Sequence, residues 1–415
     1  MAISALVAAE EGERANLVLP RMLSVSGLDE RDRGFATELA YGALRMCRAC
    51  DWLIGQFAKG ELEPAVRAAA RAGAYQLAFM RVPAYAAVSA TVAECPPRAR
   101  PLLNAVLRRV ADLVAAGPVR WPDPGTRLSY PDWMLARLGE DLGAARALAA
   151  LEQMNQAASP STRPDGYIQD AGSQAVGEYL ASLLAGRSGP VLDLCAAPGG
   201  KTTFLAHGSA FVVGVDVAPA RARLVAGNAG RLQLPNVAVV VADGTQPPFR
   251  PETFAGALVD APCSGLGVLR RRPDARWRAR PEDVGRLASL QRRLLSAAAP
   301  LVAPGGVLVY SVCTLTRKET VDIDEWLAGG RDAGGDGGPG GDGGLSGTGM
   351  PGGRDAGADG GLSGARRLGG TGRLGGDWEP APPPGPPWEP LGRGALLLPQ
   401  AAGTDGMYVL ALCRR

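Results

Sequence analysis

Two cysteines in the second half of the chain stand where they could perform covalent chemistry. Cys263 follows an apolar run in "VDAPCSGLG", and Cys313 follows another in "YSVCT". Sites of α/β proteins form at strand ends of this kind. A free thiol is most often buried packing, but a thiolate that adds to carbon 6 of a pyrimidine makes carbon 5 nucleophilic. A second thiol could then assist the elimination.

Histidine-based mechanisms are nearly excluded, because the chain contains one histidine, His207. It falls in the helix expected after a glycine turn, and we expect it at the surface. Acid–base work must therefore be done by another group. Asp260, three residues before Cys263, is the best placed carboxyl, and it could donate to ring N3 if it were protonated.

A glycine turn ahead of these cysteines predicts a cofactor site. The stretch "DLCAAPGGKTT", residues 193–203, nearly spells a phosphate-binding loop, but Cys195 occupies the position of the first glycine. That glycine begins the wrap around phosphates, so a triphosphate is not expected there. The absence of G-x-G-x-x-G also weakens the case for a dinucleotide. A cofactor with a ribose and an adenine but no phosphate remains, namely S-adenosylmethionine.

Acidic residues at successive strand ends support this prediction. Asp193 ends the first apolar run, and Asp216 ends the second, where it could hold the ribose hydroxyls. Asp243 ends the third run, "VVVAD", and could reach the adenine amino group. An aspartate at a strand end is more often a helix cap. Three such acids in one βαβαβ run favour the cofactor site.

The surrounding pattern predicts two kinds of domain. Helical periodicity dominates residues 1–125, and residues 126–165 indicate a helical connection. Short β-rich runs then alternate with helices, which is typical of a Rossmann-like α/β domain with a parallel sheet. We expect it over 166–328 and 379–415, with "GMYVLALCRR" as a last edge strand. The Gly-dominated stretch 329–378 cannot bury a core and is predicted to be a disordered insertion.

Composition narrows the class of protein. A net charge of +3 does not by itself argue for nucleic acid. No signal peptide is recognisable, and no apolar run reaches the length of a membrane span. Seven scattered cysteines fit a reducing cytoplasm. The pair Cys47 and Cys50 forms a C-x-x-C without a second pair, so we expect buried thiols and no metal. A monomer is expected.

One segment could contact RNA through its own charges. The stretch "LRRRPDARWRAR", residues 269–280, packs arginines around one tryptophan. Arginine neutralises phosphates and an aromatic ring can stack on a base. A solvated basic loop is the alternative. The position just after the candidate catalytic loop favours RNA, and the predicted RNA-binding residues are Arg270, Arg271, Arg272, Arg276 and Trp277.

Together these residues resemble the RNA cytosine-C5 methyltransferases, in particular the bacterial branch that modifies small-subunit ribosomal RNA. The stretches "QDAGSQ", "LDLCAAPGGKT", "DAPCSGLGVLRRRPDARW", "YSVCT" and "GTDGMYVLAL" follow the order of that family. The pair "DAPCSG" and "YS-x-C" is specific to it. The N-terminal part resembles the branch's all-α, NusB-like RNA-binding domain, through "RDRGFATELAYGALR" and "LLNAVLRR".

The resemblance implies roles for individual residues. It makes Cys313 the nucleophile and Cys263 the cysteine that releases the product. Lys201 and Asp260 would face the target base. A class I S-adenosylmethionine-dependent methyltransferase domain and 16S ribosomal RNA as the partner are also implied. The implied cofactor-binding residues are Cys195, Ala196, Ala197, Pro198, Gly199, Gly200, Lys201, Asp216, Asp243 and Asp260.

The sequence departs from the family pattern at three places. Pro164 runs almost directly into Gln169, where the family has a longer stretch that forms part of a small RNA-binding subdomain. The Gly-rich insertion separates the last strand from the nucleophile. "CTLTRKET" replaces the usual acidic "EEN" after the cysteine.

Two alternative functions remain. A methyltransferase fold acting on a protein or a small molecule would not need the two cysteines. A non-catalytic RNA-binding or assembly factor would show no turnover.

Overall fold

The computed structural model describes residues 1–80, 82–329, 373–374 and 376–415. The predicted insertion, 329–378, falls mainly on residues outside these ranges. Of the helices within them, none combines the length and the apolar character that a membrane crossing requires. The same ranges hold no group of three or more acidic, cysteine or histidine residues that could hold a metal ion.

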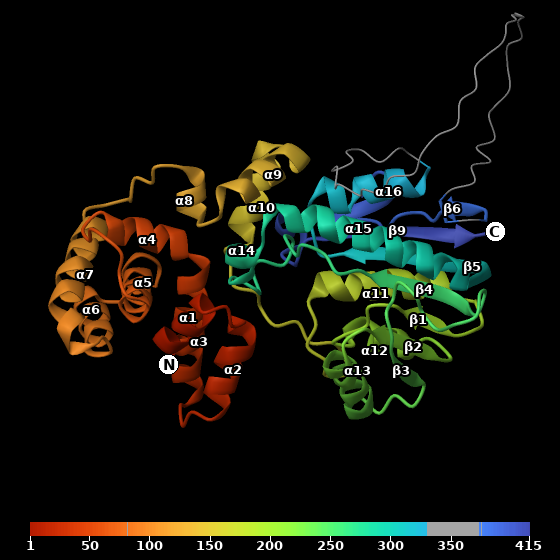
Figure 1. Ribbon diagram of the computed structural model, residues 1–415, viewed down its shortest axis with the longest axis horizontal. Coiled ribbons are helices and arrows are strands. Elements are labelled where there is room, and N and C mark those ends of the chain that lie inside the picture. The colour runs from red at the N-terminus through yellow and green to blue at the C-terminus, as the bar shows by residue number, and fades with distance from the viewer. Residues whose placement is uncertain (81, 330–372, 375) are drawn as a thin grey trace, which may run out of the picture.

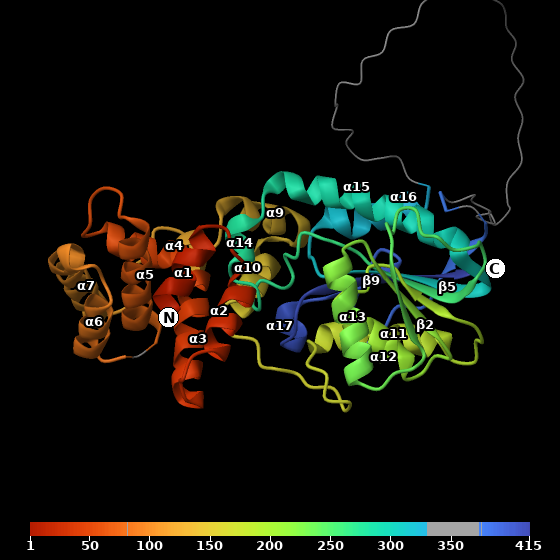
Figure 2. The same ribbon diagram turned by 60° about the horizontal axis from the view of Figure 1, so that its bottom comes forward.

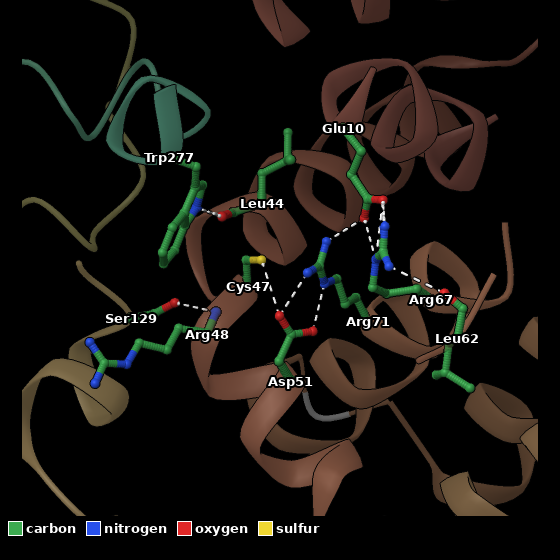
Figure 3. Close-up of polar contacts among 10 residues, drawn as sticks. All are labelled: Glu10, Leu44, Cys47, Arg48, Asp51, Leu62, Arg67, Arg71, Ser129 and Trp277. Atoms are coloured by element: carbon green, nitrogen blue, oxygen red, sulfur yellow. Dashed lines mark hydrogen bonds and ion pairs between the residues drawn. The ribbon is translucent and has the colours of Figure 1, made fainter. Parts of the chain in front are cut away.

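The N-terminal part is all helical, as predicted. Its helices surround one apolar core in which small alanines of α5 let the neighbouring helices approach closely. Arg71 of α5 ties α1 to α4, because its guanidinium bonds both Glu10 and Asp51 (Figure 3). The helices are α1 (Ala2–Glu10), α2 (Ala15–Ser24), α3 (Glu30–Arg45), α4 (Cys47–Gly55), α5 (Pro64–Phe79), α6 (Ala84–Ala93) and α7 (Arg100–Ala115), with a 3₁₀ turn η1 at Pro97–Ala99.

Three helices connect this part to the sheet: α8 (Pro124–Leu128), α9 (Asp132–Leu142) and α10 (Ala144–Gln153). α9 begins at Asp132, after Pro131 at the N-cap, within the helical connection predicted for residues 126–165. Apolar side chains of α9 and α10 share one core with the sheet and α15. The connection is therefore packed on the sheet-containing domain rather than extended between domains (Figure 1).

The second domain is built on a mixed sheet with the order β3-β2-β1-β4-β5-β9-β8-β7. Its first five strands are parallel, as the alternating pattern predicts. The strands are β1 (Val191–Asp193), β2 (Val212–Asp216), β3 (Val237–Val241), β4 (Phe254–Asp260), β5 (Val302–Val312), β6 (Trp378–Pro380), β7 (Glu389–Leu391), β8 (Gly394–Leu397) and β9 (Met407–Arg414).

Helices cover both faces of the sheet. α15 packs on β4 and β5 from one face, and α11 packs on the same strands within a separate core on the other face (Figure 1). The helices of this domain are α11 (Ala171–Leu184), α12 (Gly200–Ala206), α13 (Pro219–Arg231), α14 (Ala275–Arg278), α15 (Pro281–Ala298), α16 (Val321–Leu327) and α17 (Pro399–Ala402), with 3₁₀ turns η2 (Ala299–Leu301) and η3 (Arg317–Glu319).

The prediction of β9 as an edge strand is wrong. β9 lies between β5 and β8, and it also pairs with β6. Its residues 407–412 are all buried. Short antiparallel strands that follow the insertion cover it, and their weak patterns did not reveal them. The edge on this side is β7.

The two domains meet at a seam formed by α14. Figures 1 and 2 both place this short helix between the N-terminal helices and the sheet. Trp277 donates its indole N–H to the carbonyl of Leu44 at 2.8 Å (Figure 3). Arg276 is fully buried and donates to the carbonyl oxygens of Arg45 and Ser129. Its guanidinium also lies 3.8 Å from the centre of the Tyr130 ring.

This seam corrects part of the RNA-binding prediction. Arg276 exposes no surface to a phosphate, and the polar edge of Trp277 is occupied by a backbone carbonyl. Both residues hold the domains together. Arg270 is 6% exposed and donates to the carbonyl of Gly403. Within the predicted set, Arg271 and Arg272 are exposed.

Candidate active site

The candidate catalytic residues gather at the carboxyl edge of the parallel strands. β4 ends at Asp260, with Cys263 three residues later, and β5 ends one residue before Cys313. The two strands are hydrogen-bonded neighbours, and Asp260 is in register with Ser311. Adjacent parallel strands deliver their following loops to the same edge of a sheet. The sequence spacing therefore becomes a spatial cluster.

The two thiols are in direct contact. Sγ of Cys263 lies 3.1 Å from Sγ of Cys313, which is a hydrogen-bond distance and not a disulfide. The hydrogen bond from Cys263, helped by the positive charges of Lys201 and Arg272, lowers the pKa of Cys313 against the effect of burial. The same hydrogen bond, burial and the charge of Glu319 raise the pKa of Cys263. These opposite directions favour a thiolate on Cys313 over one on Cys263.

A lysine and an aspartate complete the cluster. Lys201, the second residue of α12, donates from Nζ to Oδ2 of Asp260 at 2.7 Å. Burial lowers the pKa of this nearly buried lysine, but the charge and hydrogen bond of Asp260, together with the charges of Cys313 and Asp193, outweigh burial and raise the pKa. Lys201 is therefore an ammonium ion, and Asp260 is its partner. The ammonium group of Lys201 can therefore donate a proton at this position.

Glu319 is a residue that sequence reasoning missed. Its buried carboxylate accepts from the backbone N–H of Ser264 at 2.8 Å and from the Ser264 hydroxyl at 2.6 Å. Further donors are Gln291, Thr314 and Thr316, at 2.9 to 3.1 Å. These donors come from the Cys263 loop, the Cys313 loop and α15. Glu319 therefore fixes the two thiol loops against each other.

A signal for Glu319 was present in "CTLTRKET". The segment was noted because it lacks the usual "EEN", yet it still supplies an acid six residues after Cys313. Hydroxyl residues at 314 and 316 surround that acid in sequence. Short polar side chains spaced around a buried acid are the donors that such a carboxylate needs.

The glycine turn lies beside this cluster. Gly199 has a left-handed backbone (φ +104°), and a Cβ there would lie 3.1 Å from Cα of Val225. Asp193 ends β1 and accepts from the Thr202 hydroxyl at 2.7 Å. Its other oxygen, Oδ1, is buried without a hydrogen-bond partner among the described residues. Burial raises the pKa of Asp193 to about 7. An unpaired buried carboxyl oxygen next to a glycine turn fits a polar cofactor group.

The predicted cofactor residues occupy one stretch of the sheet edge. Asp216 ends β2 and is 5% exposed, and one of its oxygens accepts from the N–H of Ala218. Asp243 follows β3 and is exposed, and its Oδ1 accepts from both the N–H and the hydroxyl of Thr245. β1, β2 and β3 are neighbours, so the three acids lie at the same carboxyl edge of the sheet. The remaining members of the turn are Cys195, whose pKa is raised by burial, and Ala196, Ala197, Pro198 and Gly200.

The shortened segment before "QDAGSQ" supports this turn. Arg163 is 3% exposed and donates to the carbonyl of Gly200 at 2.6 Å and to Oε1 of Gln169 at 3.1 Å. Thr162 and Ile168 form an isolated antiparallel bridge, which closes this segment into a hairpin. His207 is half-exposed and bonds Asp165 of the hairpin at 2.9 Å, so its predicted surface position is confirmed.

Comparison with known proteins identifies the family. A family model described as 16S rRNA methyltransferase RsmB/F matches residues 182–333, and the NusB family model matches residues 1–112. Ribosomal RNA small subunit methyltransferase B of Thermus thermophilus is 37% identical over 348 residues, which span 77% of this chain and 84% of that protein. A putative methyltransferase of Mycobacterium tuberculosis is 37% identical over 373 residues, 74% of this chain and 81% of that one.

Solved structures agree on the fold. The crystal structure of PH0851 superposes with a TM-score of 0.70 and 18% identity, and covers 99% of this chain and 97% of that one. The methyl donor of such enzymes is S-adenosylmethionine, as the glycine turn predicts. The chain therefore belongs to the RsmB/F family of 16S ribosomal RNA methyltransferases, with a NusB domain at its N-terminus.

Proposed function

We propose that this protein methylates carbon 5 of a cytosine in 16S ribosomal RNA, through a covalent bond between Cys313 and carbon 6 of the base. The observation that carries the proposal is the pair of thiols 3.1 Å apart, with opposite pKa shifts. Methylation of an amine or an oxygen needs no thiol nucleophile. Carbon 5 of cytosine is a poor nucleophile until a thiolate adds at carbon 6.

In the proposed mechanism, the Cys313 thiolate forms the S–C6 bond while the Lys201–Asp260 pair supplies a proton to ring N3. Bound S-adenosylmethionine supplies the electrophilic methyl group. The carbon-5 proton is then lost to solvent, ring N3 returns its proton to the Lys201–Asp260 pair, and the S–C6 bond breaks with its electron pair to restore the aromatic ring and the Cys313 thiolate. Cys263, beside the departing sulfur, assists this elimination. Lys201 also favours the thiolate form of Cys313, because its charge lowers the pKa of that thiol.

The cysteine roles can be separated on a denaturing gel. We expect Cys263→Ala to accumulate a protein–RNA adduct that requires S-adenosylmethionine, because attack still occurs and release fails. Cys313→Ala should form no adduct and show background activity, and the double variant should behave like it. Cys413→Ala is the matched control, since this free thiol lies on β9 away from the cluster. An adduct in Cys313→Ala that is absent from Cys263→Ala would reverse the two roles.

A separate experiment must identify the methylated base. Bisulfite sequencing of 16S ribosomal RNA from a deletion strain should reveal one cytosine that loses its protection, and the complemented strain should regain it. Unchanged turnover in both single cysteine variants would refute the cytosine-C5 chemistry while leaving the family assignment intact.

A further inference from the structure

A groove of about 330 Å³ opens between the two domains, beside the seam. α3 of the NusB domain forms one wall, and two segments of the other domain form the opposite wall. The groove contains apolar, hydroxyl and charged groups together. Its main lining residues are Tyr41, Arg45, Ser161, Ile168, Arg270 and Arg271.

Arg45, the last residue of α3, lacks an anionic partner. It is 5% exposed, and its hydrogen bond as a donor is a long one, 3.4 Å from Nη2 to the carbonyl of Arg270. Its Nε has no partner, and no carboxylate of the described residues lies at ion-pair distance. Two other arginines of the same domain differ: Arg48 and Arg71 each bond two carboxylates (Figure 3 shows those of Arg71).

A second cation increases the positive charge at this point. Arg276 donates from Nη1 to the backbone carbonyl of Arg45, and it too lacks a carboxylate partner among the described residues. Burial, together with the charge of Arg45, lowers the pKa of Arg276 to about 10. A charge that is removed from water without a partner is costly. Two such cations side by side leave the groove wall electropositive.

The acids that face the groove do not neutralise Arg45. Glu38 accepts from the hydroxyl of Tyr75 at 2.5 Å. Asp170 caps α11 by accepting from the N–H of Gly172 at 2.9 Å. Arg271 is bonded to the buried Asp405. The guanidinium of Arg45 therefore retains donors for an outside anion.

The rest of the groove fits a nucleotide. Tyr41 and Ile168 both line the groove, where the Tyr41 residue is partly exposed and Ile168 is 68% exposed. A ring and an aliphatic surface accept a base or a ribose, and Ser161 adds a hydroxyl. Guanidinium groups bind phosphate oxygens through paired donors. The groove lies near the candidate active site. Arg272, next to the groove residue Arg271, lowers the pKa of Cys313. The groove residue Gln169 lies against the glycine turn, since a Cβ on Gly200 would be 3.1 Å from it.

We propose that this interdomain groove binds the sugar–phosphate backbone of the ribosomal RNA near the target nucleotide, with Arg45 as a phosphate ligand and Tyr41 as a stacking surface. The substrate class rests on the proposed function. The proposal assigns the NusB domain a direct part in the binding site, since α3 supplies both residues.

The test compares Arg45→Met with wild type, in a Cys313→Ala background so that no covalent bond forms. Fluorescence anisotropy with transcribed 16S ribosomal RNA is measured over a series of salt concentrations. One lost phosphate contact should weaken binding about 10-fold and reduce the slope of log K against log[salt] by roughly 0.7–0.9. The melting temperature should stay equal or rise, because a buried unpaired charge is removed.

Three further variants make the result specific. Arg45→Lys keeps the charge and should retain the salt slope. Tyr41→Phe should bind like wild type, whereas Tyr41→Ala should bind more weakly with an unchanged slope. Arg187→Met is the matched loss of an exposed arginine at the amino end of β1, and should bind like the parent.

Two outcomes would overturn the proposal: an Arg45→Met salt slope equal to that of Arg187→Met, or a lowered melting temperature without a change in slope. A sodium sulfate titration adds an arm for free anions. Sulfate should raise the melting temperature of the parent more than that of Arg45→Met. Because binding is scored without methylation, a failure of cytosine-C5 chemistry leaves this result unaffected, and a failure here leaves the adduct assay unaffected.

Discussion

The sequence predicts a functional role for both halves of segment 260–280. In the structure, the first half lies in the candidate active site and the second half packs between the domains. In the first half, Asp260 and Cys263 stand at a strand end and reach the predicted cluster with Lys201 and Cys313. In the second half, Arg276 and its neighbour turn inward to the domain seam. Strand ends have a fixed destination in a parallel sheet. The sequence of a basic run does not determine whether its side chains face solvent or the interior, because that depends on which elements pack against the run.

The first prediction concerns the acid that orders the thiol loops. We expect Glu319→Ala to lower the free energy of unfolding by about 3–5 kcal/mol, because it leaves several buried donors without an acceptor. Adduct formation should fall with it, since Ser264 next to Cys263 loses two hydrogen bonds. Urea unfolding and the gel assay measure the two effects.

Two variants test whether Glu319 orders the thiol loops through its hydrogen bonds or only through the volume of its side chain. Glu319→Gln can place its oxygen where Ser264 N–H and Gln291 donate, and its amide towards hydroxyls that can accept. It should therefore keep most of the stability and the adduct. Thr316→Val removes a single donor and should cost about 1 kcal/mol. If Glu319→Ala proves no more harmful than Thr316→Val, the carboxylate does not organise the loops.

The second prediction concerns the other half of the segment. Arg276→Met should lower the free energy of unfolding by about 2 kcal/mol, because carbonyls of Arg45 and Ser129 lose their donor inside the seam. Arg127→Met is the matched control: Arg127 and its partner Glu152 are both about half-exposed, and surface pairs contribute about 0–1 kcal/mol. Equal losses in both variants would mean that Arg276 does not stabilise the seam.

A structural feature of this protein could be predicted from the sequence when the residues that determine it are close together in the chain, and not when they are far apart. The parallel strands, the thiol pair and the glycine turn follow from local pattern and strand order, and they agree with the structure. β9 was misplaced because its neighbours are short strands after a long insertion. Arg276 was misassigned because its partners are about 120 to 230 residues away in the chain. The domain boundaries and the cofactor contacts remain predictions.

The last prediction concerns Asp193, whose carboxyl lies under the glycine turn. Burial raises its pKa from 3.8 to about 7. Between these values the folded state holds the proton that the unfolded state has lost, so the folded state binds more protons and stability falls as pH rises. The slope is at most one proton, about 1.4 kcal/mol per pH unit. Urea unfolding of the apoprotein should therefore show stability decreasing from about pH 4 to pH 7 relative to Asp193→Asn.

A second strand-end acid provides the control for this slope. Asp243 is exposed, and its pKa is lowered by the N–H and hydroxyl of Thr245. Its contribution is present above its unfolded pKa and is lost only as pH falls through the folded value. Asp243→Asn should therefore run parallel to wild type between about pH 4.5 and 7.5. If Asp193→Asn also runs parallel to wild type there, Asp193 is ionised in the folded protein. The unpaired Oδ1 would then carry a charge that a cationic group of the cofactor could neutralise.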